Sequence, residues 1–141
     1  MTIKEIQDEI VDEFSMFDDW MQRYEYIIEL GKTLPLIDEQ YKTEDNIIKG
    51  CQSKVWLTAS EEDNKINYLA DSNTDITKGL ISLLIRVLSG RSPEEIIKAE
   101  LDFIDKIGMG NIIGSQRSNG LAAMIKQIKL YAIAYQAKLN A

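Results

Sequence analysis

The segment from Ile76 to Leu88 is the feature that most restricts the fold. Drawn as a helix, it is apolar on nearly every side; its large apolar residues are Leu80, Ile81, Leu83, Leu84, Ile85, Val87 and Leu88. A helix of this kind has to be buried on most of its faces. Gly90 follows as a stop signal. The segment is therefore predicted to be a central helix that the rest of the chain must cover.

Two strands are predicted just before this helix. Apolar residues at Val55, Leu57 and Ala59 alternate with Trp56 and Thr58, and the alternation resumes at Ile66, Tyr68 and Ala70 after a polar turn over residues 61–65. This pattern indicates an antiparallel hairpin. Ile47-Ile48 is predicted to add a third, shorter strand, which would place residues 50–53 in a connection between strands.

Helices are predicted on both sides of the hairpin. Their signals are a capping box at Thr2 and Glu5, a helix from Asp18-Asp19 to Gly31 with Trp20, Tyr24, Ile27 and Ile28 on one face, an N-cap at Ser92-Pro93, and a long final helix after residues 115–120. Gly108 and Gly110 are predicted to bracket a loop. The fold class is therefore α+β, with a small antiparallel three-stranded sheet packed against helices in a single domain, residues 1–141.

Charge restricts the partners of the chain. Its 141 residues carry 16 basic and 23 acidic side chains, a net charge of -7, which repels nucleic acid and anionic membrane surfaces. The N-terminal residues lack the pattern of a signal peptide, and no apolar run is long enough to span a bilayer. We therefore expect a cytoplasmic protein that binds neither nucleic acid nor membrane.

The inventory of reactive side chains excludes most catalytic layouts. The chain has no histidine and one cysteine, so it cannot build a Ser-His-Asp triad, a Cys-His pair, an imidazole metal site or a four-cysteine cluster. The acidic runs at residues 18–19, 61–63 and 94–95 lack calcium-loop spacing and fit helix starts or solvated turns. We expect no bound metal and no bound cofactor.

Cys51 is the remaining candidate, and its sequence context allows two interpretations. A free cysteine is commonly a small buried hydrophobic residue. Here, however, Gly50 lets the backbone bend, and Lys49 and Lys54 place positive charge near a loop thiol, a setting that favours a thiolate nucleophile.

Several short motifs make the chain resemble the SufE-like sulfur acceptors, a family that includes the CsdE proteins. The most specific is Gly50-Cys51-Gln52-Ser53 followed by Val55-Trp56; the others are Trp20 with Tyr24, Gly31, Leu34-Pro35, Ala70-Asp71-Ser72, Gly79-Leu80 and residues 115–121. The similarity runs over nearly the whole chain. One mild departure is residues 72–75, where the family is often more acidic, which bears on partner preference more than on fold.

The resemblance implies a sulfur relay. In the family, a desulfurase that carries pyridoxal phosphate takes sulfur from L-cysteine as a persulfide, and the acceptor cysteine carries it toward an iron–sulfur scaffold. Cys51 occupies the acceptor position. The chain would then be a sulfurtransferase-type accessory protein that stimulates a SufS- or CsdA-like desulfurase, not an independent enzyme. Thiol–persulfide exchange needs a thiolate and no histidine base.

The family's fold is similar to that of IscU-type scaffolds, but a single cysteine implies that this chain carries sulfur without ligating a cluster. Whether it is a monomer or a homodimer stays open. Gln52 and Ser53 are candidates for hydrogen bonds around the sulfur, or for shaping the turn. Arg117 and Asn119, expected just before the last helix, are candidates for partner contacts, or for ordinary capping.

Other matched residues have structural interpretations. Asp71, Ser72 and Asp75 are expected to cap the central helix, and Trp20 and Trp56 are expected in the core. Two alternative functions also remain: a redox sensor or thiol peroxidase that uses Cys51, and an adaptor with an inert cysteine. For the relay, we expect Cys51 to rest in a partly sheltered loop that opens when the desulfurase docks.

Overall fold

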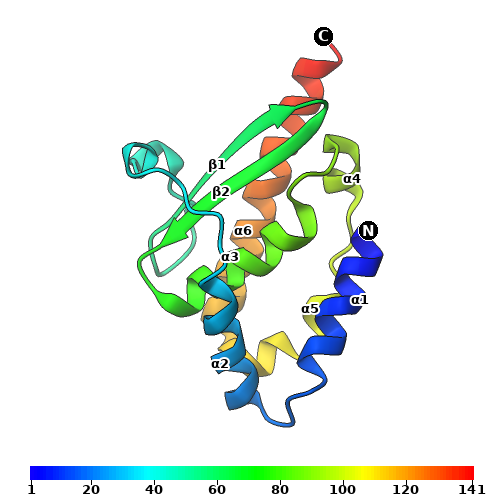
Figure 1. Ribbon diagram of the computed structural model, residues 1–141. Helices are drawn as coiled ribbons and strands as arrows, with labels where there is room; N and C mark the ends of the chain where they lie inside the picture. Colours follow the sequence, from blue (N-terminus) through cyan, green and yellow to red (C-terminus); the bar gives the residue numbers. More distant parts are fainter.

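The computed structural model describes all residues, 1–141, and forms a layered α+β fold (Figure 1). In chain order the elements are α1 (Ile3–Phe14), α2 (Trp20–Gly31), the 3-10 helices η1 (Glu39–Tyr41) and η2 (Glu44–Asn46), β1 (Val55–Glu62), β2 (Lys65–Ser72), α3 (Asp75–Leu88), α4 (Pro93–Lys98), α5 (Phe103–Lys106) and α6 (Met109–Leu139). The predicted fold class is confirmed in this coarse form. No helix is both long and apolar enough to cross a membrane.

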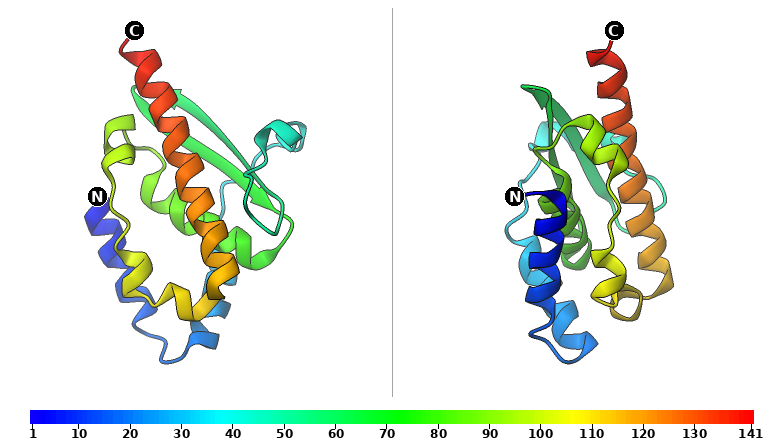
Figure 2. Two further views of the ribbon diagram at one scale, coloured as in Figure 1. Left: turned by 180° about the vertical axis from the view of Figure 1, so that it is seen from behind. Right: turned by 90° about the vertical axis from the view of Figure 1, so that its right-hand side faces the viewer.

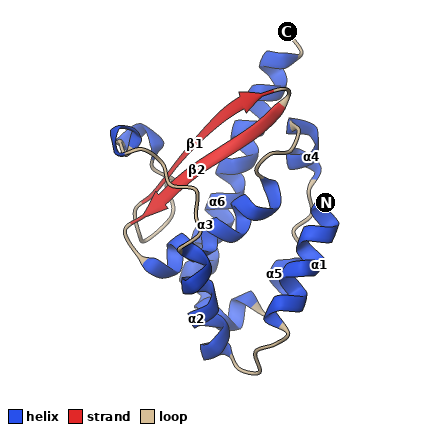
Figure 3. Cartoon of the chain, in the orientation of Figure 1, coloured by secondary structure: helices blue, strands red, loops and turns tan.

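The predicted hairpin is confirmed. β1 and β2 pair antiparallel from Val55 opposite Ser72 to Glu62 opposite Lys65. Asp63 and Asn64 form the turn with positive φ angles of 52° and 64°, which is the backbone that a tight hairpin turn requires. Figure 3 shows α3 and α6 together behind the hairpin, so one face of the sheet is covered by helices.

The predicted third strand is wrong, because the sheet has two strands. Ile47 makes one isolated bridge to Trp56, and the Ile48 N–H donates to the Val55 carbonyl at 2.8 Å. The 3-10 helix η2 ends at Asn46, and Gly50 turns the chain with φ +98°. Too little extended chain lies between these two bends to form a strand.

α3 is the central helix, as predicted. Most of its residues are buried, and the apolar ones form the middle of the hydrophobic core. α2 crosses it where Gly31 and Gly79 meet: a Cβ atom at Gly79 would lie 2.1 Å from the Ile27 carbonyl oxygen. The two backbones therefore approach each other as closely as glycine allows.

The predicted helix starts are confirmed at three positions. Thr2 and Ser92 each form a capping box, and the Asp19 side chain accepts from the Gln22 N–H at 2.8 Å. Trp20 was predicted in the core, which is wrong: it is 53% exposed. As the first residue of α2 it lies beyond the part of that helix that packs, whose buried residues are Ile27 and Gly31. Trp56 is half-buried.

The final helix begins earlier than predicted. α6 starts at Met109, so the predicted loop at Gly108–Gly110 is wrong: Gly108 is the N-cap and Gly110 lies inside the helix. A kink at Gly114 (φ 78°, ψ 175°) separates the start of α6 from the long remainder. Figure 2 shows α6 running along the back of the hairpin. The Tyr131 and Tyr135 hydroxyls donate to the Leu57 and Ala59 carbonyls at 3.2 and 3.0 Å.

Candidate functional site

Cys51 lies in the loop that leads into β1 and faces α6. Its thiol donates to the Gly120 carbonyl oxygen at a sulfur–oxygen distance of 3.5 Å, and the residue is half-buried. A Cβ atom at Gly120 would stand 3.6 Å from Sγ. This is an ordinary van der Waals distance, so the thiol packs directly against the backbone of α6 at Gly120.

A small pocket of about 70 Å³ adjoins this loop. Its lining residues are Gln52, Ser53, Thr77, Leu80, Gln116, Arg117, Gly120 and Met124. Three of the predicted supporting residues, Gln52, Ser53 and Arg117, thus meet at one pocket beside the candidate thiol. Most of the lining residues are polar, and Leu80 and Met124 are the two apolar ones.

The chain just after Cys51 is anchored to the start of α3. The Ser53 hydroxyl lies 2.9 Å from the Thr74 hydroxyl and 3.3 Å from that of Thr77, and Thr74 donates to Thr77 at 2.8 Å. The Lys54 N–H donates to the Asn73 side chain at 3.0 Å, and the Asn73 N–H donates back to the Lys54 carbonyl at 3.2 Å. The C-terminal half of the loop is therefore fixed by several bonds.

The side of the loop nearest the thiol has fewer attachments. Gln52 donates from Nε2 to Oε1 of Gln116 at 2.9 Å, between two exposed side chains. Arg117 was expected before a helix, which is wrong, since it lies within α6, with its guanidinium 5.8 Å from the Tyr24 ring centroid. Asn119 also lies within α6; its side chain is exposed and makes no hydrogen bond with the Cys51 loop.

Burial controls the ionisation of the thiol. Removal from water raises the pKa of Cys51 above its ordinary value. Lys49 and Lys54 were expected to lower it, but both side chains are exposed and neither offsets the burial. The resting protein therefore holds mainly a neutral thiol at pH 7. A nucleophilic role requires a change that admits water or a positive group.

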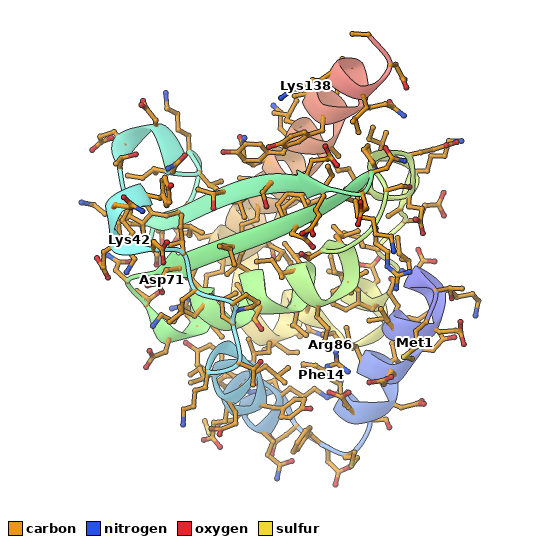
Figure 4. The ribbon with its side chains drawn as sticks, turned by 45° about the horizontal axis from the view of Figure 1, so that its top comes forward. Met1, Phe14, Lys42, Asp71, Arg86 and Lys138 are labelled. Atoms are coloured by element: carbon orange, nitrogen blue, oxygen red, sulfur yellow. The ribbon has the colours of Figure 1, made fainter.

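A partly buried ion pair on β2 has no signal in the sequence. Asp71 was expected to cap α3, but its carboxylate instead forms ion pairs with Lys42 and Lys78, whose Nζ atoms lie 2.6 and 3.4 Å from its oxygens (Figure 4). Burial opposes ionisation of Asp71, but the Lys42 hydrogen bond, the Ser72 N–H and the charge of Lys78 outweigh it and lower its pKa. Lys42 also lies 5.6 Å from the Trp56 ring centroid.

This pair ties the η1 segment to the strand that ends near the Cys51 loop. Ser72 also does not cap α3 in the predicted way: its hydroxyl donates to the Lys54 carbonyl at 2.8 Å, and α3 begins after Thr74, whose side chain makes no capping bond. Asp75 is in the first turn of α3. No group of three or more histidine, cysteine, aspartate or glutamate side chains lies close enough together to hold a metal ion.

Comparison with known proteins gives one consistent result. Residues 8–132 match the family model described as SufE, Fe-S metabolism associated domain. An uncharacterised SufE-like protein of Rhizobium meliloti is 40% identical over 127 residues, covering 86% of this chain and 91% of that protein. One from Synechocystis is 38% identical over 127 residues, covering 90% of this chain and 80% of that protein.

Two further likenesses extend this result. SufE-like protein 1 of Arabidopsis thaliana, described as chloroplastic/mitochondrial, is 37% identical over 131 residues, which cover 92% of this chain and 35% of that protein. The solution structure of a hypothetical protein from Thermus thermophilus superposes with a TM-score of 0.77 at 18% identity, covering 94% of this chain and 96% of that one. The second likeness concerns the fold alone.

Proposed function

The chain belongs to the SufE family, and from this premise we propose that it is a sulfur-transfer protein of iron–sulfur metabolism with Cys51 as acceptor. Its sulfur donor is a cysteine desulfurase of the SufS or CsdA kind, whose activity it stimulates. It passes the sulfur toward an iron–sulfur scaffold. The pyridoxal phosphate belongs to the desulfurase, and this chain needs no cofactor of its own.

The transfer step is an exchange at sulfur. The Cys51 thiol loses its proton, and the thiolate attacks the outer sulfur of a persulfide on the desulfurase cysteine. A new S–S bond forms to Cys51, the old S–S bond breaks, and the desulfurase cysteine leaves as a thiolate that takes up a proton. No net oxidation or reduction occurs, so no additional oxidant or reductant is required.

The observation that carries this proposal is the half-buried Cys51 thiol, 3.5 Å from the Gly120 carbonyl and next to a pocket of about 70 Å³. A neutral, partly covered thiol is slow to react with dissolved oxidants. Next to Cys51, the loop is held to α6 by one exposed hydrogen bond between the Gln52 and Gln116 side chains. A docking partner can replace this bond with its own contacts. The site thus favours a thiol that becomes reactive on docking.

The same observation disfavours the alternatives. A thiol peroxidase or redox sensor needs a low-pKa thiolate in the resting protein, whereas burial raises the pKa of Cys51. An adaptor with an inert cysteine does not require the polar pocket beside the thiol. A cytoplasmic location stays a prediction, as does the choice between monomer and homodimer.

The test is intact-mass spectrometry after incubation with a cysteine desulfurase and L-cysteine. We expect the wild type to gain one sulfur atom, which a reductant removes, and the Cys51→Ser variant to gain none. Desulfurase turnover should rise with the wild type and not with the variant. Absence of the added sulfur with desulfurases of both kinds would refute the proposal.

A further inference from the structure

Three large apolar side chains are exposed at the entry to α2. Met16, Trp20 and Met21 are 74%, 53% and 54% exposed and all fall within residues 16–21. We call these three residues the α2-entry patch. Single exposed apolar residues are ordinary, but large apolar side chains that gather in one region mark interaction surfaces. Tryptophan in particular is a frequent anchor of protein interfaces.

The backbone beneath the patch is well fixed. Asp19 caps α2, and the Asp18 N–H donates to the Gln22 side chain at 3.2 Å. Arg23 donates to the Phe17 carbonyl at 3.1 Å and to the Ile107 carbonyl at 2.8 Å, which ties the entry to the segment before α6. The exposed side chains are therefore presented on a rigid base, which lowers the entropic cost of binding.

The patch continues toward the Cys51 site. Tyr24 follows Trp20 by one helical turn and lies on the same face of α2. Arg117 lies over the Tyr24 ring and, with Gln52, lines the pocket beside Cys51. Trp20, Tyr24, Arg117 and Gln52 thus form a connected series from the patch to the loop that carries the thiol. A partner that reaches Cys51 on this side has the patch within its footprint.

The charge around the patch restricts what can cover it. Residues 5–31 contain one basic side chain, Arg23, which is engaged with backbone carbonyls. Among the acidic ones, Asp12, Asp18 and Glu25 are exposed and make no ion pair, whereas Asp8, Glu9, Glu13 and Glu29 are paired with Lys4, Arg86 and Lys32. A second copy of this chain meeting the patch with its own would bring like charges together, which is unfavourable. The protein that binds the α2-entry patch should therefore carry lysine or arginine side chains around its apolar contact surface.

We propose that the α2-entry patch is a docking anchor for the desulfurase, which receives Trp20 in an apolar pocket rimmed by lysine or arginine side chains. This inference rests on the proposed function and deepens it by naming the side of the molecule that the donor covers. Its contribution is to affinity. The chemistry at Cys51 is the same once the complex has formed.

The test measures transfer of sulfur from a persulfide-loaded desulfurase to Cys51 at increasing concentrations of this protein. We expect Trp20→Ala, and Trp20→Ala combined with Met21→Ala, to raise the half-saturating concentration about tenfold or more, with an unchanged maximum rate. Ile133→Ala is the matched control, because Ile133 is 48% exposed on α6, away from this series. It should leave both quantities unchanged.

Charge reversal supplies a second arm. Glu25→Lys, next to Tyr24 in α2, should raise the half-saturating concentration and weaken its dependence on salt, whereas Glu62→Lys at the end of β1 should not. Unchanged half-saturation in the Trp20 variants, or a fall in maximum rate alone, overturns the docking role. A wild type that accepts no sulfur overturns the proposed function itself, and the inference with it.

Discussion

At the scale of single residues, Cys51 is controlled by its neighbours. Ser53 and Lys54 are bound to the start of α3, whereas Cys51 makes only a weak bond of its own, to the Gly120 carbonyl. Sulfhydryl groups are poor hydrogen-bond donors. The position of the thiol therefore depends on burial and on the Gln52–Gln116 bond.

The pH dependence of thiol labelling tests the effect of burial. Burial raises the pKa of Cys51 in the folded chain, and only the thiolate reacts with iodoacetamide. We expect the labelling rate of the native protein to rise with pH along a curve displaced to higher pH than that of the urea-unfolded protein. A native curve at lower pH would mean that a positive charge, not burial, dominates at the thiol.

Loss of the Gln52–Gln116 bond should expose the thiol. An exposed neutral hydrogen bond contributes about 1 kcal/mol, so Gln116→Ala should raise the native labelling rate of Cys51 about fivefold at fixed pH. The thermal midpoint should fall by only about 3 °C, as expected for a loss of about 1 kcal/mol in a domain of this size. Gln136→Ala, a glutamine far along α6, is the control. An equal rate in Gln116→Ala and wild type would show that the bond does not restrain the loop.

At the scale of elements, the contact of α2 with α3 depends on Gly79. An added Cβ would lie 2.1 Å from the Ile27 carbonyl oxygen and 2.5 Å from the Ile27 side chain, so one helix would have to shift. Gly79→Ala should lower the free energy of unfolding by about 3 kcal/mol. In chemical denaturation, this variant should unfold at much lower urea concentration than the wild type.

The control for this prediction is Gly110→Ala. Gly110 is within α6, and a Cβ there meets nothing within 4 Å. Replacement of an unconstrained helical glycine by alanine is stabilising by about 0.5–1 kcal/mol. The two identical substitutions should therefore have opposite signs. A stable Gly79→Ala protein would mean that α2 can move away from α3 at little cost.

Most elements were predictable because their signals are local. The capping boxes at Thr2 and Ser92 and the alternation in β1 and β2 each lie within a few residues of the structure they specify. The predicted third strand was wrong because Ile47-Ile48 has the apolar pattern of a strand, whereas Gly50 bends the chain two residues later. The predicted start of α6 was wrong because a glycine at a helix kink and a glycine in a loop give the same signal in the sequence.

The site was predictable only in part. Gly50, Cys51, Gln52 and Ser53 are adjacent in sequence, so their shared loop followed from the hairpin. The contacts that connect this loop to Gln116, Thr74 and Thr77 join residues far apart in the chain, and no periodic pattern encodes them. The same reason applies to the exposure of Trp20, since amphipathic spacing cannot tell where a helix extends beyond the body.

At the scale of the whole molecule, two acidic groups connect distant segments. Glu13 of α1 forms an ion pair with Arg86 of α3, and Asp71 of β2 forms one with Lys42, which lies just after η1. The Arg86 hydrogen bond lowers the pKa of Glu13 against the opposing effect of burial, and the Lys42 bond does the same for Asp71. These groups hold the N-terminal half of the chain on the central helix and the sheet.

These two groups predict how stability depends on pH. A carboxyl whose pKa is lower in the folded than in the unfolded chain contributes stability above its unfolded pKa, and this is lost as the pH falls through the folded value. The thermal midpoint should therefore stay level from about pH 8 to pH 5 and fall below about pH 4.

Asp71→Asn isolates one contribution to this acid transition. The Asp71 side chain is 10% exposed, and a hydrogen bond to a charged group is worth about 1.5–3 kcal/mol. The variant should therefore lose about 2 kcal/mol at pH 7, and this loss should shrink as the pH falls below the unfolded pKa of aspartate and vanish only below the lowered pKa of the folded carboxyl. Asp45→Asn, an exposed residue of η2, should follow the wild-type curve throughout. A loss of equal size at pH 7 and pH 3 would show that the shape of Asp71, not its charge, holds η1 on the sheet.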